Sequence, residues 1–97
     1  MIKLTITKSK LKDKKFKAVF TEQNKVIKTT QFGAKGMSDY TIHKDLKRRT
    51  LYRNRHKKDL KTNDPMRAGF LSYFLLWGDS TDFKKNLKKY KNKYNFV

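Results

Sequence analysis

The excess of positive charge is the feature that most constrains how this chain can fold. Its 97 residues include 26 Lys and Arg but only 8 Asp and Glu, which gives a formal net charge of +18. Unpaired charged side chains stay in water, so most of this charge must lie on the surface and the core must come from the few segments without Lys or Arg. Such a surface attracts polyanions: nucleic acid, an anionic membrane or an acidic protein.

Aromatic residues supply material for that core. They make up 13% of the chain, which argues against a disordered basic tail, and the length predicts a single domain over residues 1–97. The chain has no cysteine, which excludes disulfide scaffolds and thiolate metal sites. The first residues lack a signal-peptide core, and the apolar run 70–77 is far shorter than the roughly 20 residues of a membrane span. We therefore expect a protein that is neither secreted nor membrane-spanning.

Alternation of apolar and polar residues predicts three β-strands within residues 1–32. Two segments alternate apolar residues with Lys and Thr, and a third, 25–32, is rich in Val, Ile, Thr and Phe. This period of two is typical of a strand with one buried face. The run 22–24 has turn composition, so consecutive strands should pair as an antiparallel meander. The residues expected on the buried face are Ile2, Leu4, Ile6, Phe16, Ala18 and Phe20.

The remaining residues predict a loop and three α-helices, which makes the fold class α+β. Residues 33–43 are expected to form a glycine-containing loop, followed by a basic helix over 44–61. An apolar helix over 65–77 should pack on the sheet. The last helix, 81–94, is amphipathic, with an apolar stripe at helical spacing that consists of Phe83, Leu87, Tyr90 and Tyr94.

Capping residues predict where the last two helices begin and end. Asp64 suits the N-cap of the apolar helix and Pro65 its first position, while Gly78 is expected to end that helix in the left-handed conformation. The final helix should begin at Ser80 or Thr81, with Asp82 in its first turn.

The segment 44–61 is the predicted nucleic-acid contact surface. It holds nine of the 26 basic residues and four of the five arginines. Arginine suits bidentate contacts with phosphates, and each neutralised phosphate releases counterions. Tyr52 could stack or donate a hydrogen bond, and two glycines would let the loop backbone approach an anion. The predicted contacts are Arg48, Arg49, Arg53, Arg55, Lys57, Lys58, Lys35, Lys44, Tyr52, Gly33 and Gly36.

The predicted binding is largely independent of base sequence. The chain has no zinc-finger spacing, leucine zipper or RNP motif. The lysine-rich segment 8–15 is a second candidate for phosphate contact. Both basic segments also have an alternative interpretation without a binding role, in which the charged helix and loop are only surfaces exposed to water.

We expect no enzymatic activity, catalytic residue, metal site, cofactor or small-molecule substrate. His43 and His56 are the only histidines, and the eight acidic residues are scattered singly. The letters of His43-Lys44-Asp45 match a phospholipase D motif, but that chemistry needs a wider spacing.

Three other uses of these features remain open. The positive charge could bind an acidic protein partner. The helix 81–94 could lie on an anionic membrane, although its apolar stripe is better explained by closing the core. The helix 65–77 could form the seam of a homodimer instead of lying entirely in the core.

A series of short motifs appears in a fixed order through most of the chain. It consists of Phe32-Gly33-Ala34-Lys35-Gly36, Ser38-Asp39-Tyr40-Thr41 and His43-Lys44-Asp45, then Tyr52, Arg55-His56, Asp64-Pro65, Ala68-Gly69, Leu71-Ser72 and Leu76-Trp77. This series resembles a family of small basic proteins encoded by nucleocytoplasmic large DNA viruses of protists. The resemblance implies a viral protein located in the virion, the host nucleus or a cytoplasmic viral factory.

Charge and resemblance together lead to one functional prediction and one alternative. The prediction is binding of DNA, in preference to RNA, during genome packaging, compaction or expression. The alternative is a structural or interaction protein of the virion that binds an acidic protein.

Overall fold

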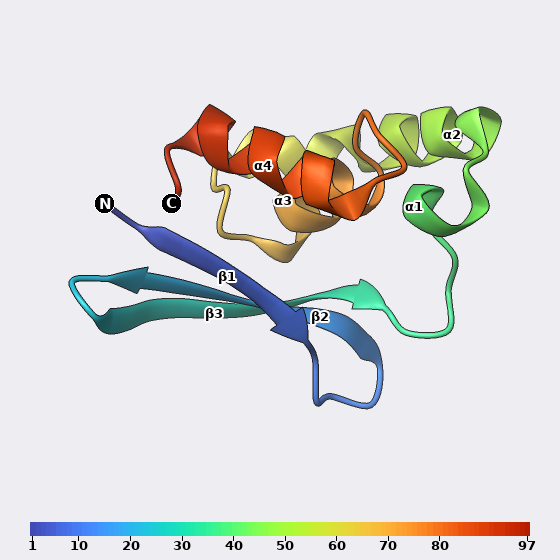
Figure 1. Ribbon diagram of the computed structural model, residues 1–97. Helices are drawn as coiled ribbons and strands as arrows, with labels where there is room; N and C mark the ends of the chain where they lie inside the picture. Colours follow the sequence, from blue (N-terminus) through green and yellow to red (C-terminus); the bar gives the residue numbers. More distant parts are fainter.

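A three-stranded antiparallel sheet forms one layer of the protein, and the helices cover one face of it (Figure 1). The structure is a computed structural model that describes residues 1–97. Strands β1 (Lys3–Lys8), β2 (Lys14–Glu22) and β3 (Lys25–Ala34) lie in the order β1-β2-β3. The predicted N-terminal antiparallel meander and the α+β class are confirmed.

A two-residue turn joins β2 to β3. Gln23 and Asn24 both have positive φ, 51° and 64°, as expected for a hairpin turn that follows the right-handed twist of the strands. The pairing register is shifted between Phe20 and Thr21, which marks a β-bulge near this turn.

The buried face of the sheet contains the residues predicted for it. Leu4, Ala18 and Phe20, at the centre of the predicted face, are all buried.

Helical segments make up most of the chain after the sheet. There are four α-helices where three were predicted, because residues 33–43, expected to be a loop, include a short helix. Two of the four continue directly into a short 3₁₀- or π-helical segment. The segments are α1 (Tyr40–His43), α2 (Leu46–His56), the 3₁₀-helix η1 (Lys57–Thr62), α3 (Ala68–Leu71), the π-helix η2 (Ser72–Leu76) and α4 (Phe83–Tyr94).

The α-helix predicted over 44–61 is shorter than expected at both ends: it begins at Leu46, and after His56 it becomes a 3₁₀-helix. Asp39 caps α1 and Asp45 caps α2, each through its side chain, and Lys44 between them is left-handed with φ 57°. Each aspartate accepts hydrogen bonds from the free N–H groups at the start of its helix. A new helix therefore begins after Asp45, and α1 does not continue into α2. At the other end, α2 tightens into η1 after His56.

The apolar helix begins three residues later than predicted. Asp64 does accept a hydrogen bond from the Met66 backbone N–H at 3.0 Å, but its own carbonyl accepts from Arg67 and closes a turn. The helix then starts at Ala68. Its last turn is π-helical, since the Trp77 N–H donates to the Ser72 carbonyl.

Gly78 does not have the left-handed conformation that the sequence predicts. Positive φ among the glycines is confined to Gly33 and Gly36. Gly78 is required by space instead, because a Cβ there would lie 2.1 Å from the Phe74 carbonyl oxygen. The backbone approaches that carbonyl too closely for any side chain.

The final helix is capped by Asp82, not by Ser80 or Thr81. The Asp82 carboxylate accepts hydrogen bonds from the Lys84 and Lys85 backbone N–H groups, and α4 therefore begins at Phe83. The apolar stripe of α4 packs on the core as expected, with Tyr90 fully buried.

The core lies between the sheet and the helices, and the segment formed by α3 and η2 is at its centre. Phe20 and Phe32 from the sheet meet Leu71 and Leu75 from this segment, and all four are buried. The predicted packing of the sheet on the apolar helix is therefore confirmed. No helix combines the length and apolar character needed to cross a membrane.

Candidate nucleic-acid interface

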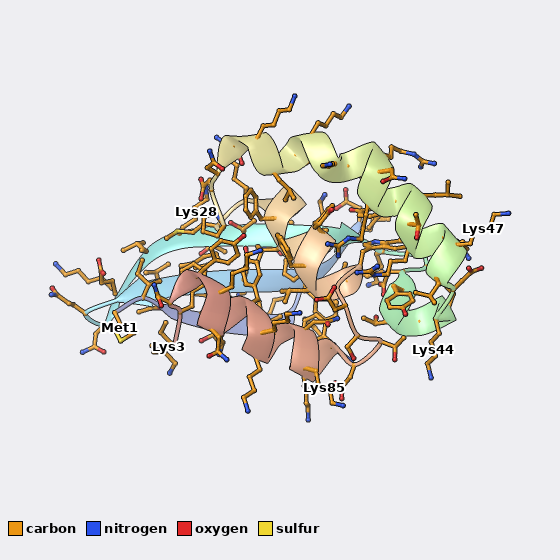
Figure 2. All side chains as sticks on the ribbon, turned by 90° about the horizontal axis from the view of Figure 1, so that it is seen from above. Met1, Lys3, Lys28, Lys44, Lys47 and Lys85 are labelled. Atoms are coloured by element: carbon orange, nitrogen blue, oxygen red, sulfur yellow. The ribbon has the colours of Figure 1, made fainter.

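Most of the positive charge has no carboxylate partner within the fold. Among the 26 Lys and Arg side chains, only Lys15, Arg49, Arg67 and Lys89 lie within 4.0 Å of a carboxylate oxygen. Several acidic residues are used instead as helix caps. The charge projects on more than one side, since Lys44, Lys47 and Lys85 point away from the body in different directions (Figure 2). Net charge alone therefore does not single out a contact surface.

The four arginines of α2 divide between two faces of that helix. Arg49 and Arg53 turn inward, toward the end of η2. Arg49 Nε donates to the Gly78 carbonyl at 2.7 Å, and Arg53 Nη1 donates to the Trp77 carbonyl at 2.8 Å. A helix C-terminus leaves carbonyl groups unpaired and carries partial negative charge. These two arginines therefore stabilise the end of the apolar helix, in addition to any contact they make outside the protein.

The outward face of α2 carries the other two arginines. Arg48 and Arg55 are exposed, and neither has a carboxylate within salt-bridge distance. They flank Tyr52 in a cavity of about 230 Å³ whose opposite wall is Met37 and Ser38. The structure thus brings two predicted arginines to one opening between α2 and the loop after β3.

A second cavity of about 280 Å³ adjoins the first and reaches the sheet. Arg55 and Tyr52 line both cavities, and the second extends to Lys15, Gly33 and Asp39. We call the two cavities together the loop groove. The groove thus joins residues from β2, the loop after β3, α2 and η2.

Tyr52 is held in a column of aromatic rings. It stacks on Trp77 with a centroid distance of 4.2 Å and an interplanar angle of 6°, and on His56 at 4.2 Å. His43 adds a further ring 5.2 Å from Trp77. Both faces of the Tyr52 ring are therefore covered, and the predicted stacking on a base would require the column to open.

The hydroxyl of Tyr52 is also perturbed. Burial, and after it the negative charges of Asp59 and Asp39, raise the pKa of Tyr52 to about 12.

An ion pair fixes the floor of the loop groove. Lys15 Nζ lies 2.6 Å from Asp39 Oδ2, and both side chains are largely buried. Asp39 also accepts hydrogen bonds from the backbone and the hydroxyl of Thr41, which locks the start of α1. The pair thereby links β2 to the loop after β3, and the Lys15 charge is neutralised internally.

The predicted loop over 33–43 begins two residues later, because Gly33 and Ala34 belong to β3, and the two glycines have separate roles. Gly33 has φ 80°, and a Cβ there would lie 3.0 Å from Leu76 Cδ1 and 3.1 Å from Lys15 Cβ. Gly36 has φ 89° and open space around it, in a turn closed by the Met37 N–H and the Ala34 carbonyl. Lys35 between them is exposed, and its backbone N–H donates to the Asp13 carbonyl at 3.0 Å.

The remaining predicted contacts flank α2. Lys44 precedes this helix, and Lys57 and Lys58 follow it on η1; all three are exposed. Residues that sequence reasoning missed are Asp39, His56 and Trp77, which line the groove, and their position within the ordered motifs is a usable signal for all three. Lys15, from the candidate segment 8–15, also lines the groove, but its charge is paired with Asp39.

The histidines have structural partners. His43 Nδ1 accepts a hydrogen bond from the Asp45 backbone N–H at 2.9 Å, while its Nε2 is buried without a partner. His56 Nδ1 lies 3.2 Å from Asp59 Oδ2. The structure contains no group of three or more His, Asp or Glu side chains placed to hold a metal ion.

Comparison with known proteins assigns the chain to a family. The sequence model of the family described as "Family of unknown function (DUF5754)" matches residues 4–56, more than half of the chain. The chain therefore belongs to this family. The matched region covers the sheet, the loop after β3 and α2, and so most of the loop groove. No curated protein and no solved structure matches the chain.

Proposed function

We propose that the protein binds DNA through phosphate contacts, largely independently of base sequence, and that the outward face of α2 with its flanking loop is the contact surface. The proposed contacts are Arg48, Arg55, Lys57, Lys58, Lys44 and Lys35. Arg49 and Arg53 are left out of this set because they turn toward the end of η2 and not to the outward face of α2.

One observation carries the proposal: Arg48 and Arg55 are exposed without carboxylate partners and line the same groove. A guanidinium without a carboxylate partner at the surface keeps its N–H donors free for bidentate hydrogen bonds to a phosphate. The exposed lysines at both ends of α2 extend this cationic strip beyond the groove. The 11 residues of α2 span about 16 Å at the rise of an α-helix, which is enough to meet several phosphates.

The biological setting of the proposal comes from the motif resemblance. A viral protein of this kind would act in genome packaging, compaction or expression, in the virion, the host nucleus or a cytoplasmic viral factory. The proposal favours DNA over RNA on that ground, and it includes no catalytic step.

The salt dependence of binding tests the proposed surface. With six phosphates engaged, the affinity for a generic duplex should fall by roughly 1,800-fold over a fourfold rise in salt, from a slope of about 0.9 per phosphate. The double variant Arg48→Gln/Arg55→Gln should reduce this to roughly 150-fold. Fluorescence anisotropy across a salt series measures both slopes.

A charge-matched variant provides the control. Lys84→Gln/Lys88→Gln removes the same two charges from exposed positions on α4, and it should leave the slope near the wild-type value. Equal flattening by both double variants would show that binding follows net charge and not the α2 face. An unchanged slope in the arginine variant would refute the proposed surface.

A second function is favoured by exposed apolar side chains of the groove and of the neighbouring helices. Met37 and Leu51 line the groove and are 67% and 53% exposed, and Ile42 on α1 and Leu46 on α2 are 61% and 64% exposed. Apolar side chains next to free arginines suit an acidic protein partner that also presents apolar anchors. Partners captured from virions after nuclease treatment, and lost with Leu51→Gln, would favour this function. Capture that disappears entirely with nuclease would exclude it.

A further inference from the structure

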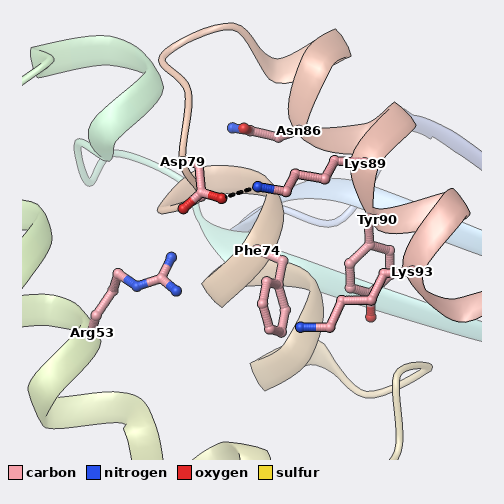
Figure 3. A pocket seen from close by; sticks show the side chains of 8 residues that line it. Arg53, Phe74, Asp79, Asn86, Lys89, Tyr90 and Lys93 are labelled. Carbon is pink, nitrogen blue, oxygen red and sulfur yellow. Dashed lines mark hydrogen bonds and ion pairs between the residues drawn. The ribbon is translucent and has the colours of Figure 1, made fainter.

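A small cavity on the other side of α2 is surrounded by positive charge. It has a volume of about 190 Å³ and lies between α2, the end of η2 and α4 (Figure 3). Arg53 enters it from α2, Lys89 and Lys93 enter from α4, and the rings of Phe74 and Tyr90 form its apolar wall. We call this cavity the inter-helix pocket.

The lining side chains leave two positive charges in the pocket uncompensated. Asp79 is the only carboxylate there, and it pairs with Lys89 and, at 3.0 Å, with Arg49 from outside the lining. Arg53 and Lys93 have no carboxylate partner. The lining alone therefore carries three cations against one anion.

Contacts with aromatic rings hold the two unpaired cations in place. The Arg53 guanidinium lies 4.1 Å from the Tyr73 ring centroid, and Lys93 Nζ lies 4.5 Å from that of Phe74. Such contacts orient a cation without neutralising it. Arg53 uses Nη1 for the Trp77 carbonyl, and its other N–H groups have no hydrogen-bond partner in the protein. The donors are therefore preorganised and available.

The rest of the pocket is rigid and electropositive. Asn86 is buried and donates to the Leu75 and Ser80 carbonyls while accepting from the Ser80 N–H, so it forms a fixed wall. The pKa of Asp79 is lowered from its ordinary value, chiefly by the hydrogen bond from Lys89 and further by the charges of Lys89, Arg49 and Arg53. An anion in the pocket would experience the same field.

Size and charge define the ligand. Pockets for drug-sized molecules begin at about 300 Å³, so this cavity suits a single anionic group better than a whole nucleotide. A phosphomonoester carries about −1.5 to −2 at neutral pH, whereas a bridging phosphodiester carries about −1. The two uncompensated charges match the monoester.

We infer that the inter-helix pocket binds a terminal phosphate group of a nucleic-acid strand through Arg53, Lys89 and Lys93. This inference rests on the proposed function for its ligand source, because a free phosphate ester offers the same chemistry. It adds recognition of strand ends to binding along the backbone.

Three duplexes of one sequence test the inference: one with a 5′-phosphate, one with a 3′-phosphate and one with neither. The wild-type protein should bind at least one phosphorylated duplex about tenfold more tightly than the unphosphorylated one, as expected for charge-assisted hydrogen bonds. Lys93→Gln should abolish this preference, while Lys84→Gln, an exposed position outside the pocket, should keep it. Thermal melting of each variant checks that it is folded.

Inorganic phosphate separates this inference from the proposed function. Titrated at constant ionic strength, it should shift the Asn86 side-chain amide signals in NMR spectra of the wild type but not of Lys93→Gln. Those shifts without any duplex binding would support the pocket for free phosphate esters and refute DNA binding. Equal affinity for the three duplexes, or a preference that survives Lys93→Gln, would overturn the inference while leaving the backbone contacts intact.

Discussion

Replacing Arg53 with Met should lower the free energy of unfolding by about 2–4 kcal/mol, whereas Arg55→Met should change it by less than about 0.5 kcal/mol. Both substitutions remove one positive charge from α2 and keep an unbranched side chain of similar length. The relief of charge repulsion is therefore similar in the two variants. The difference between them isolates what Arg53 does inside the fold.

The expected magnitude comes from two contacts of Arg53. Its hydrogen bond to the Trp77 carbonyl, at 2.8 Å, has a charged donor and contributes about 1.5–3 kcal/mol. Its guanidinium lies 4.1 Å from the centroid of Tyr73, a cation–π contact that adds about 0.5–1 kcal/mol for a partly exposed cation. Arg55 is exposed and makes neither kind of contact.

Urea unfolding at neutral pH, with thermal melting alongside, measures the difference. A loss of 2 kcal/mol corresponds to a decrease in Tm of roughly 8–16 °C for a domain of this size. Arg53→Lys should fall between the wild type and Arg53→Met, because lysine retains the charge but not the planar guanidinium. Equal stability of Arg53→Met and Arg55→Met would refute the assignment of Arg53 to the end of η2.

Three further predictions concern the loop groove. The raised pKa of Tyr52 means that the unfolded chain loses this proton first, so stability should fall between pH 10 and 12 by up to about 2–3 kcal/mol. Urea midpoints of Tyr52→Phe should fall less steeply over that range, and parallel curves would contradict this. Gly33→Ala should cost more stability than Gly36→Ala in thermal melts, since both have positive φ but only Gly33 is crowded; equal losses would argue against crowding. Asp39→Asn should cost about 3 kcal/mol in urea unfolding by leaving Lys15 unpaired, and an unchanged midpoint would show that this ion pair is not stabilising.

The sheet was predictable because its signals are local. Strand alternation and the turn at Gln23 and Asn24 depend on neighbouring residues, and the hairpin register follows from them. The apolar stripe of α4 was predictable for the same reason, since Phe83, Leu87, Tyr90 and Tyr94 recur at helical spacing and face one core. Each of these predictions required only that apolar side chains leave water.

The break before α2 was harder to predict because nothing in its composition announces it. Lys44 has a left-handed conformation that is usually taken by Gly or Asn, so the sequence placed Lys44 inside the basic helix and the short helix before it in a loop. Two aspartate caps six residues apart, Asp39 and Asp45, were the available signal. Their strength depends on backbone geometry that the sequence does not display.

The two roles of the arginines could not be predicted from the sequence. Arg49 and Arg53 follow each other at i and i+4 on one face of α2, but a charged residue is ordinarily expected to face water. They turn inward because the end of η2 presents unpaired carbonyl groups at that point. That requirement comes from the tertiary arrangement of two distant segments.

The π-helical turn at 72–76 has a consequence for how α2 is attached to the rest of the protein. A π turn holds one residue more than an α turn, and each residue rotates an α-helix by about 100°. Deleting one residue here would turn Trp77 away from Tyr52 and move the Trp77 and Gly78 carbonyls out of reach of Arg53 and Arg49. The additional residue thus aligns the end of the apolar segment with the ring of Tyr52 and with the two inward arginines at the same time. A one-residue deletion there would detach α2 from the apolar segment and leave the sheet intact.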